Sequence, residues 1–521
     1  MNLLKPPCDE GVIAAKKGDA PCSKKLGPWI LAATILGSSM VFIDGTVVNV
    51  ALPALQTNLK ATAVDVQWVV EAYALLLAAL LLLGGSLGDH LGRKRIYAIG
   101  ITLFALASIW CGLAPTINQL ILARAVQGVG GALLVPGSLA IISASFREKE
   151  RGRAIGTWSG ATAMTTVLGP VLGGWLIQHV SWRAVFFLNL PLALIVLVLV
   201  FRFVPESRDQ EETGRLDLLG AALATISLGA IVFGLIESSR LGLQSPVVMI
   251  ALLVGVITLA AFIVVEARVP HPMMPVGLFR SANFAGANLL TLFLYAALSG
   301  TLFFLPLNLI QVQRYTPTAA GAALLPFILI MFLLSRWSGG LVKRYGSRLP
   351  LVIGPIVAAG GYALFIRPDV GGSYWTDFFP AMFVLGLGMA ISVAPLTTTV
   401  MNSVKQGHAG IASGVNNAVS RTAGLLAVAV LGLVMVQSFN RSFDRNLAHI
   451  AVSAEARRTL EAERSKLAAA EIPIEVNEEA RVAIKQAINA SFIRGFRLVM
   501  LAGVVLALLS SLSAWLMIRN G

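Results

Sequence analysis

The sequence predicts an all-α integral membrane protein, and composition and patterning both support this fold class. Of its 521 residues, 56% are hydrophobic and only 13% are charged, and the mean hydropathy is +0.79. A soluble protein normally carries about 25% charged residues. The apolar residues gather in runs of roughly 20 or more, the length of a helix that spans a bilayer. Such long, uninterrupted runs are typical of helices and not of barrel strands.

Fourteen such runs are expected to be spanning helices. They cover residues 29–52, 66–88, 96–114, 118–142, 154–178, 184–204, 217–236, 247–266, 283–309, 319–342, 349–367, 377–401, 410–437 and 494–518. The polar residues 1–28, with five lysines, form a tail before them. Because the first run is too long for a signal peptide and contains Asp44, we expect it to be retained as a helix.

The distribution of basic residues predicts the orientation. If both termini are cytoplasmic, the tails and loops on that side contain 22 Lys and Arg residues, against five in the short loops opposite. Positive residues favour the cytoplasmic side. We therefore expect a multi-pass protein of the inner (plasma) membrane with both termini inside. Because the basic residues are spread over these tails and loops, the +14 net charge does not indicate nucleic-acid binding.

The long connection 438–493 is then expected outside, with eight basic and eight acidic residues. Its part 475–492 has helical apolar spacing, which predicts an amphipathic helix on the membrane surface or capping the bundle. A docking surface for a partner protein is the alternative.

An internal repeat predicts two related halves. Gly85, Leu87 and Gly92 recur as Gly339, Leu341 and Gly346. The chain then divides into a six-helix bundle at 29–204, a linker with two extra helices at 205–282, and a second six-helix bundle at 283–521. Repeats of this kind are typical of secondary transporters, whose substrates bind between the halves.

Several stretches together resemble the major facilitator superfamily, and within it the fourteen-span drug:proton antiporters of the EmrB/QacA type. They are the loop at 85–95 and residues 44–53, 124–131, 169–174, 182–191 and 278–280. The resemblance implies a major facilitator fold and export of compounds in exchange for protons. It also implies a cytoplasmic gate at Gly85, Asp89, Gly92 and Arg93, and an antiporter motif at Gly156, Gly169, Pro170, Gly173 and Gly174.

Three charged residues inside predicted spans are candidates for proton coupling, because charge is costly in a bilayer. Asp44, Glu71 and Arg124 are expected at similar depths in the outer half of the membrane, where two carboxylates and one cation would form a titratable cluster. The alternative is a buried ion pair with a spectator acid, and Glu71 could instead extend toward the outer surface.

The sequence thus predicts a proton-coupled exporter of lipophilic, cationic or neutral compounds that works by alternating access. A dedicated exporter of one metabolite, antibiotic or lipid is the first alternative, and a non-transporting sensor is the second. We expect no enzyme, no metal and no cofactor besides the proton motive force. The expected partners are small lipophilic substrates, protons and lipid, with a monomeric state and a periplasmic adaptor protein as open questions. Substrate-binding residues are unknown; Asn49, Asn288, Asn308 and Gln311 are polar candidates among which the sequence does not select.

Overall fold

The computed structural model describes residues 26–146, 148–208, 217–270, 272–404, 409–450, 452–473 and 475–519, and these ranges contain helices and no strand. The helices are α2 (Gly27–Leu59), α3 (Ala63–Leu91), α4 (Arg93–Leu113), α5 (Ile117–Ser145), α6 (Glu148–His179), α7 (Ala184–Phe187), α8 (Asn189–Phe203), α9 (Leu218–Leu241), α10 (Pro246–Arg268), α11 (Ala282–Leu307), α12 (Pro317–Ala322), α13 (Leu325–Gly339), α14 (Leu341–Tyr345), α15 (Arg348–Leu364), α16 (Phe379–Asn402), α17 (Ala409–Leu447), α18 (Ala454–Glu463) and α19 (Glu478–Met517). Short helical turns are η1 (Val276–Arg280), η2 (Asn308–Val312), η3 (Tyr374–Phe378) and η5 (Arg464–Ala469).

Twelve of the predicted spans correspond to helices that are long and apolar enough to cross a membrane, within the described residues. The other two predicted spans, 154–178 and 349–367, fall on α6 and α15. α15 is apolar but only 17 residues long. The helical membrane fold is confirmed, and the count of fourteen crossings remains a prediction.

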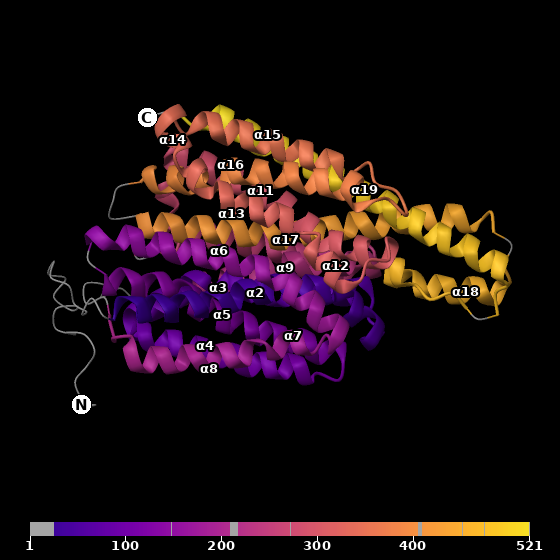
Figure 1. Ribbon diagram of the computed structural model, residues 1–521, viewed down its shortest axis with the longest axis horizontal. Helices are drawn as coiled ribbons and strands as arrows, with labels where there is room; N and C mark the ends of the chain where they lie inside the picture. The colour runs from indigo at the N-terminus through magenta and orange to yellow at the C-terminus, as the bar shows by residue number, and fades with distance from the viewer. Residues whose placement is uncertain are drawn as a thin grey trace.

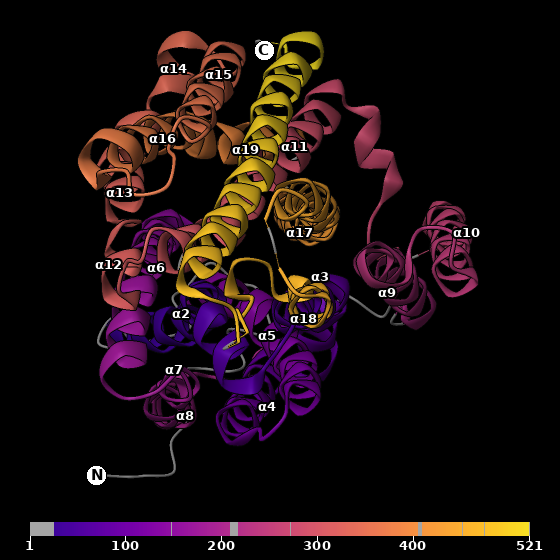
Figure 2. The same ribbon diagram turned by 90° about the vertical axis from the view of Figure 1, so that its right-hand side faces the viewer.

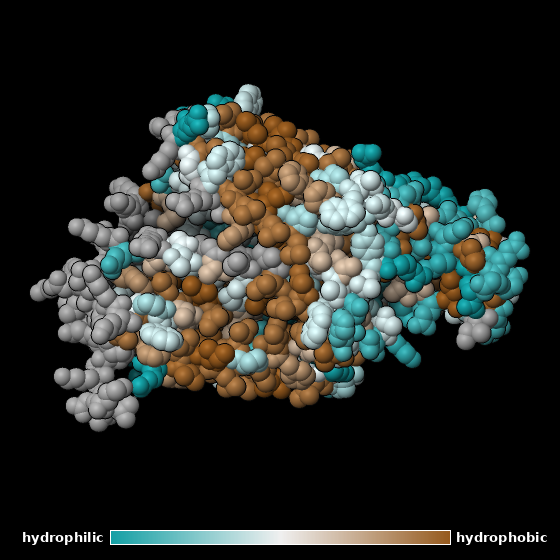
Figure 3. Space-filling model, in the orientation of Figure 1, coloured by the Kyte–Doolittle hydropathy of each residue, from teal (hydrophilic) through white to brown (hydrophobic). Residues whose placement is uncertain are grey.

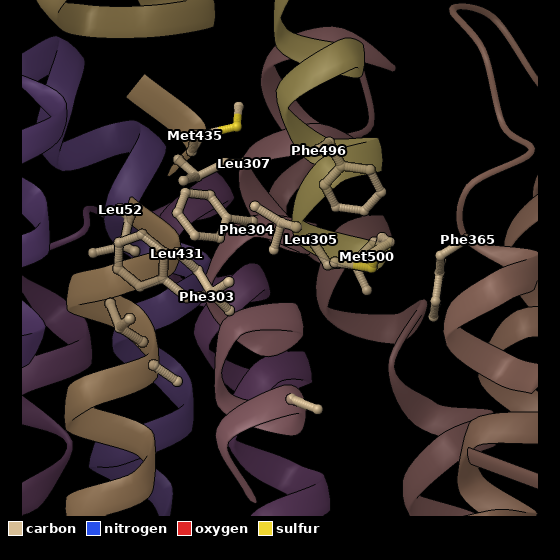
Figure 4. Close-up of a cluster of buried hydrophobic side chains, with 14 of the residues drawn as sticks. Leu52, Phe303, Phe304, Leu305, Leu307, Phe365, Leu431, Met435, Phe496 and Met500 are labelled. Carbon is tan, nitrogen blue, oxygen red and sulfur yellow. The ribbon is translucent and has the colours of Figure 1, made fainter. Parts of the chain in front are cut away.

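The helices form two bundles that lie side by side (Figures 1 and 2). α2 to α8 make one bundle and α11 to α19 the other, while α9 and α10 pack together at the side of the molecule. α9 contacts α3 of the first bundle and α17 of the second. A continuous apolar core crosses the boundary; Figure 4 shows part of it, where Leu52 of the first bundle meets Phe303, Phe304 and Leu431 of the second. Figure 3 shows a broad apolar surface along the bundles.

The connection 438–493 extends beyond the bundles as a helical projection, which we call the extension (Figure 1). α17 continues to Leu447, and α19 starts at Glu478, with α18 and η5 between them. The expected amphipathic helix is therefore the start of the 40-residue α19 and does not lie apart from the last span. Its apolar positions Ile484, Ile488 and Phe492 are buried, since they pack within the extension instead of facing lipid. Much of the surface of the extension is hydrophilic (Figure 3).

Both copies of the sequence repeat end in a glycine with positive φ, although the first is part of the continuous α3 and the second is broken at Gly340 between α13 and α14. Gly92 ends α3 with φ 114°, and Gly346 ends α14 with φ 74°. Only glycine enters this region without steric cost, which explains why a glycine closes both loops. The expected tail 1–28 lies outside the described residues up to residue 25, as do residues 209–216 of the expected linker.

Candidate functional site

Asp44 and Arg124 form an ion pair in the interior of the first bundle. Nη1 of Arg124 donates to Oδ2 of Asp44 at 2.5 Å, and the two side chains are 1% and 0% exposed. α2 continues past Pro53 to Leu59, so Asp44 lies about 22 Å from that end of its helix, at 1.5 Å per residue. The acid is thus deeper than its predicted span implied.

Neutral donors complete the coordination of the Asp44 carboxylate. Oδ1 accepts from Nε2 of Gln127 at 2.9 Å and from Nδ2 of Asn189 at 3.2 Å. Both amides also donate to Oγ of Ser108, at 3.1 and 2.9 Å. Every oxygen of Asp44 therefore has a donor. One cation and two amides thus satisfy this buried carboxylate and fix its position.

Arg124 has further contacts that fix its position. Its Nε donates to the Val69 carbonyl oxygen at 3.1 Å, its Nη1 also donates to Oε1 of Gln127 at 2.6 Å, and its guanidinium lies 4.1 Å from the centre of the Tyr73 ring. These contacts join α3, α5 and α2 at one point. Arg124 and Gln127 are three residues apart in α5 and therefore share one helix face, whereas the contributions of Ser108, Asn189 and Tyr73 depend on the fold.

Glu71 does not join this cluster, contrary to the expectation. It is 1% exposed, and neither of its carboxylate oxygens has a hydrogen-bond partner among the described residues. It follows Gln67 and Trp68 by four and three residues, and so shares their face of α3. Gln67 bonds to the Val428 carbonyl oxygen of α17 at 2.7 Å, and Trp68 bonds to Glu237 of α9 at 3.1 Å. Glu71 therefore faces the second bundle and α9, whereas Val69 and Tyr73 face Arg124.

Glu206, a residue that the sequence analysis did not suggest, contacts the predicted gate loop. Nε of Arg93 lies 2.7 Å from Oδ1 of Asp89, as expected for positions four apart. Glu206, which follows α8, accepts from the Lys94 backbone N–H at 3.1 Å and lies 3.7 Å from Arg95. A Cβ on Gly92 would lie 2.7 Å from the Glu206 carboxylate, the movable end of that side chain, so glycine is required there chiefly for its φ of 114°. Gly85 has only ordinary contacts, and its neighbour Gly84 is the one that packs against the Ala132 carbonyl of α5.

The residues of the expected antiporter motif occupy two different faces of α6. Cβ atoms on Gly169 and Gly173 would collide with Thr46 and Val47 of α2, within the first bundle. One on Gly174 would collide with the Pro317 carbonyl at the start of α12, in the second bundle. In the other direction, the Pro170 carbonyl of α6 lies against Gly321 of α12, where a Cβ would collide with it. Gly156 has nothing within 4 Å of a Cβ and takes no part in this packing.

Four hydrogen bonds join the first bundle to the second bundle and the extension near the end that carries α18. Gln56 bonds to Gln311 at 2.7 Å and to the Lys466 carbonyl at 3.2 Å. Thr318 bonds to Gln178 at 2.7 Å, and the fourth is the bond from Gln67 to α17. These polar contacts close the boundary between the bundles at that end. Within the described residues, no group of three His, Cys, Asp or Glu side chains is placed to hold a metal.

Comparison with curated proteins gives relatives with resistance and export names. The chain is 36% identical over 423 residues to the multidrug resistance protein Stp of Mycobacterium tuberculosis, covering 80% of this chain and 77% of that protein. It is 37% identical over 410 residues to the puromycin resistance protein pur8 of Streptomyces alboniger, covering 78% and 81%. It is 32% identical over 411 residues to the tetracenomycin C resistance and export protein of Streptomyces glaucescens, covering 78% and 76%.

Solved structures show the same fold. A bacterial homologue of the human lysosomal transporter Spinster, in an inward-facing and unoccupied conformation, matches with a TM-score of 0.69 and 18% identity over 94% of this chain and 98% of that one. A D-xylose–proton symporter matches with a TM-score of 0.60 and 14% identity over 96% and 99%. The profile of the Major Facilitator Superfamily matches residues 34–428. The chain belongs to the Major Facilitator Superfamily.

Proposed function

We propose that the protein is a proton-coupled exporter that expels lipophilic, cationic or neutral compounds from the cytoplasm by alternating access. It would reside in the inner (plasma) membrane with both termini inside, use the proton motive force and need no cofactor. The names of the relatives support export, and the observation that carries coupling is the placement of three buried charges. Asp44 and Arg124 are paired inside the first bundle, whereas Glu71, on the face toward the second, has no hydrogen-bond partner among the described residues.

The two acids divide the work of coupling in this proposal. Asp44 stays paired with Arg124, and this network holds α2, α3 and α5 in one arrangement. Glu71 holds the proton, because a buried carboxylate without a partner would be very costly. When the bundles separate, water reaches Glu71. Hydration lowers the free energy of the charged carboxylate, so the proton is released.

If the membrane orientation follows the basic residues, the end of the molecule that carries α18 lies on the outer side of the membrane. The structure is then closed outside by the contacts of Gln56, Gln67 and Gln178. On this proposal the Gly92 loop lies at the cytoplasmic side, and the loop and α6 guide the rocking of the two bundles.

The test is transport in proteoliposomes with an imposed proton gradient. The natural chain should release protons in exchange for a lipophilic dye, and an uncoupler should abolish uptake. Asp44→Asn and Glu71→Gln should each stop the coupled movement. Coupled transport that survives both substitutions would contradict the assignment.

A dedicated exporter of one compound remains the second candidate, and relatives named for tetracenomycin C export and as a probable actinorhodin transporter favour it. An efflux panel of chemically diverse compounds, with and without uncoupler, separates the two candidates. Several unrelated substrates would support the broad exporter, and one substrate would support the dedicated one. The same preparation, with light scattering to measure mass, tests the monomeric state. Co-purification from cells tests a periplasmic adaptor protein.

A further inference from the structure

A second set of buried acids lies at one end of the α9–α10 pair, away from the charges of the first bundle. Asp217 is the N-cap of α9 and is 9% exposed, and Glu266 lies in the last turn of α10 and is 2% exposed. The opposite end of α9 lies toward the extension, because Glu237 there bonds to Trp68 near the start of α3. The two acids therefore lie at the end of the molecule away from α18, which is the cytoplasmic end in the proposed orientation.

Glu266 belongs to the narrow face of α10 that packs against α9 at the side of the molecule (Figure 2). The other buried residues of α10 are Val248, Gly255 and Phe262, and most of the rest of this helix is apolar and exposed. An acid on the single buried face of such a helix is costly unless it has a partner or a function. Oε2 of Glu266 accepts from the Met274 backbone N–H at 2.9 Å, in the linker that leads to η1 and α11. The acid thus joins the end of α10 to this linker.

The remaining oxygens of the two acids face one another. Oδ1 of Asp217 accepts from the Gly220 backbone N–H at 2.7 Å. Oδ2 of Asp217 and Oε1 of Glu266 are buried, and no other group among the described residues donates to them. A Cβ on Gly220 would lie 2.5 Å from Oδ2 and 2.7 Å from Oε1, so glycine leaves the space in which the two carboxyls meet. They are close enough for one hydrogen bond between them.

A single proton satisfies both of these oxygens. Two ionised carboxylates have no donor between them, and they repel one another most strongly where water is excluded. Among the described residues, the charge that acts on Glu266 is that of Asp217, and the basic residues nearest in the chain, Arg268 of α10 and Arg280 of η1, are exposed. A Mg²⁺ or Ca²⁺ ion would need about six oxygen ligands, whereas two free carboxylate oxygens converge in this part of the structure.

We propose that Asp217 and Glu266 form a proton-binding site of their own, in which one proton shared by Oδ2 and Oε1 holds α9, α10 and the linker to α11 together. The inference goes beyond the proposed function, because the occupancy of this site can be measured without substrate or transport. Loss of the proton would place two like charges in one buried spot and loosen the linker at Met274. An alkaline cytoplasm would therefore weaken the connection between α10 and the second bundle.

The shared proton is tested by infrared spectroscopy of the purified chain near neutral pH, where a protonated carboxyl absorbs apart from a carboxylate. Glu266→Gln and Asp217→Asn should each remove one protonated carboxyl, and the double variant should remove no more, because the two acids hold one proton together. Glu461→Gln, at an exposed position of α18, is the matched control and should remove none. An unchanged band in both single variants, or the loss of two carboxyls in the double variant, would overturn the site. A proton on Glu71 contributes equally to all of these chains, so the failure of this site and the failure of the proposed function are distinguishable.

The structural role of the proton is tested by measuring melting temperature as a function of pH. The folded pair keeps a proton that unfolded carboxyls release, so the natural chain should lose stability as the pH rises from about 6 to about 9. Glu266→Gln should lose less, by the contribution of about one proton per chain, because its amide can donate to Asp217 at every pH. The Glu461→Gln control should follow the natural chain. Equal pH dependence of the natural chain and Glu266→Gln would contradict the proposal, as would stabilisation of the natural chain alone by Mg²⁺ at high pH, since the two oxygens would then bind a metal.

Discussion

Asp44 and Arg124, 80 positions apart in the chain, meet at 2.5 Å in the interior of the first bundle, while Glu71 lies on the opposite side of α3 from Arg124. The charges inside the membrane are thus of two kinds. One acid is tied to a cation and two amides, and the other has no partner among the described residues. Substitutions at the two acids should therefore have different consequences.

Asp44→Asn should destabilise the protein as well as stop coupled transport. Removing the carboxylate leaves the Arg124 guanidinium buried without its counter-charge, which costs about 3–5 kcal/mol. A lower melting temperature in detergent is the expected result. The double variant Asp44→Asn with Arg124→Gln should recover part of the stability but not the transport. A single variant as stable as the natural protein would show that the pair is not maintained.

Glu71→Gln should change stability by no more than about 1 kcal/mol, because in the proposed mechanism Glu71 holds the proton and a neutral amide would replace a neutral acid. It should nevertheless abolish proton movement coupled to dye transport. Melting temperature and proton flux, measured on one preparation, check both parts. A loss of stability as large as that of Asp44→Asn would mean that Glu71 is ionised and paired in the natural protein.

Gly174→Ala should be far more damaging than Gly156→Ala, although both belong to the same sequence motif. The first adds a methyl group against the Pro317 carbonyl, and overpacking of this kind typically costs about 1–3 kcal/mol. Because the clash lies between the bundles, transport should fall further than stability. Gly156→Ala meets nothing within 4 Å and serves as the control. Equal effects would contradict the packing role.

Gly92→Ala should destabilise the turn between α3 and α4. Its φ of 114° is unfavourable for alanine, and the new methyl group would contact the Glu206 carboxylate. We expect a cost of about 1–2 kcal/mol, measured as a decrease in melting temperature. Gly339→Ala, in the other copy of the repeat and with open space around it, should be neutral. Combining Gly92→Ala with Glu206→Gln should not recover the loss, since the backbone conformation remains unfavourable.

Local sequence patterns predicted most of the helices. They also predicted the charged members of the site, but not the neutral side chains around them. Apolar runs locate helices because the bilayer requires about 20 apolar residues per crossing, and charges within them mark buried sites. Helix ends were less predictable: α2 passes through Pro53, and α17 and α19 continue far beyond the expected membrane boundary. These extra turns are stabilised by packing between distant segments, which a local pattern does not contain.

By itself, the sequence determined a helical membrane protein with two related bundles and named Asp44, Glu71 and Arg124 as its buried charges. Only the tertiary structure decided that Asp44 and Arg124 pair, that Glu71 faces the second bundle, and that Glu206 completes the loop. The physical reason is that hydropathy depends on each residue and its neighbours in the chain. A hydrogen bond depends on which face of one helix meets which face of another, and that is fixed only when all the helices pack.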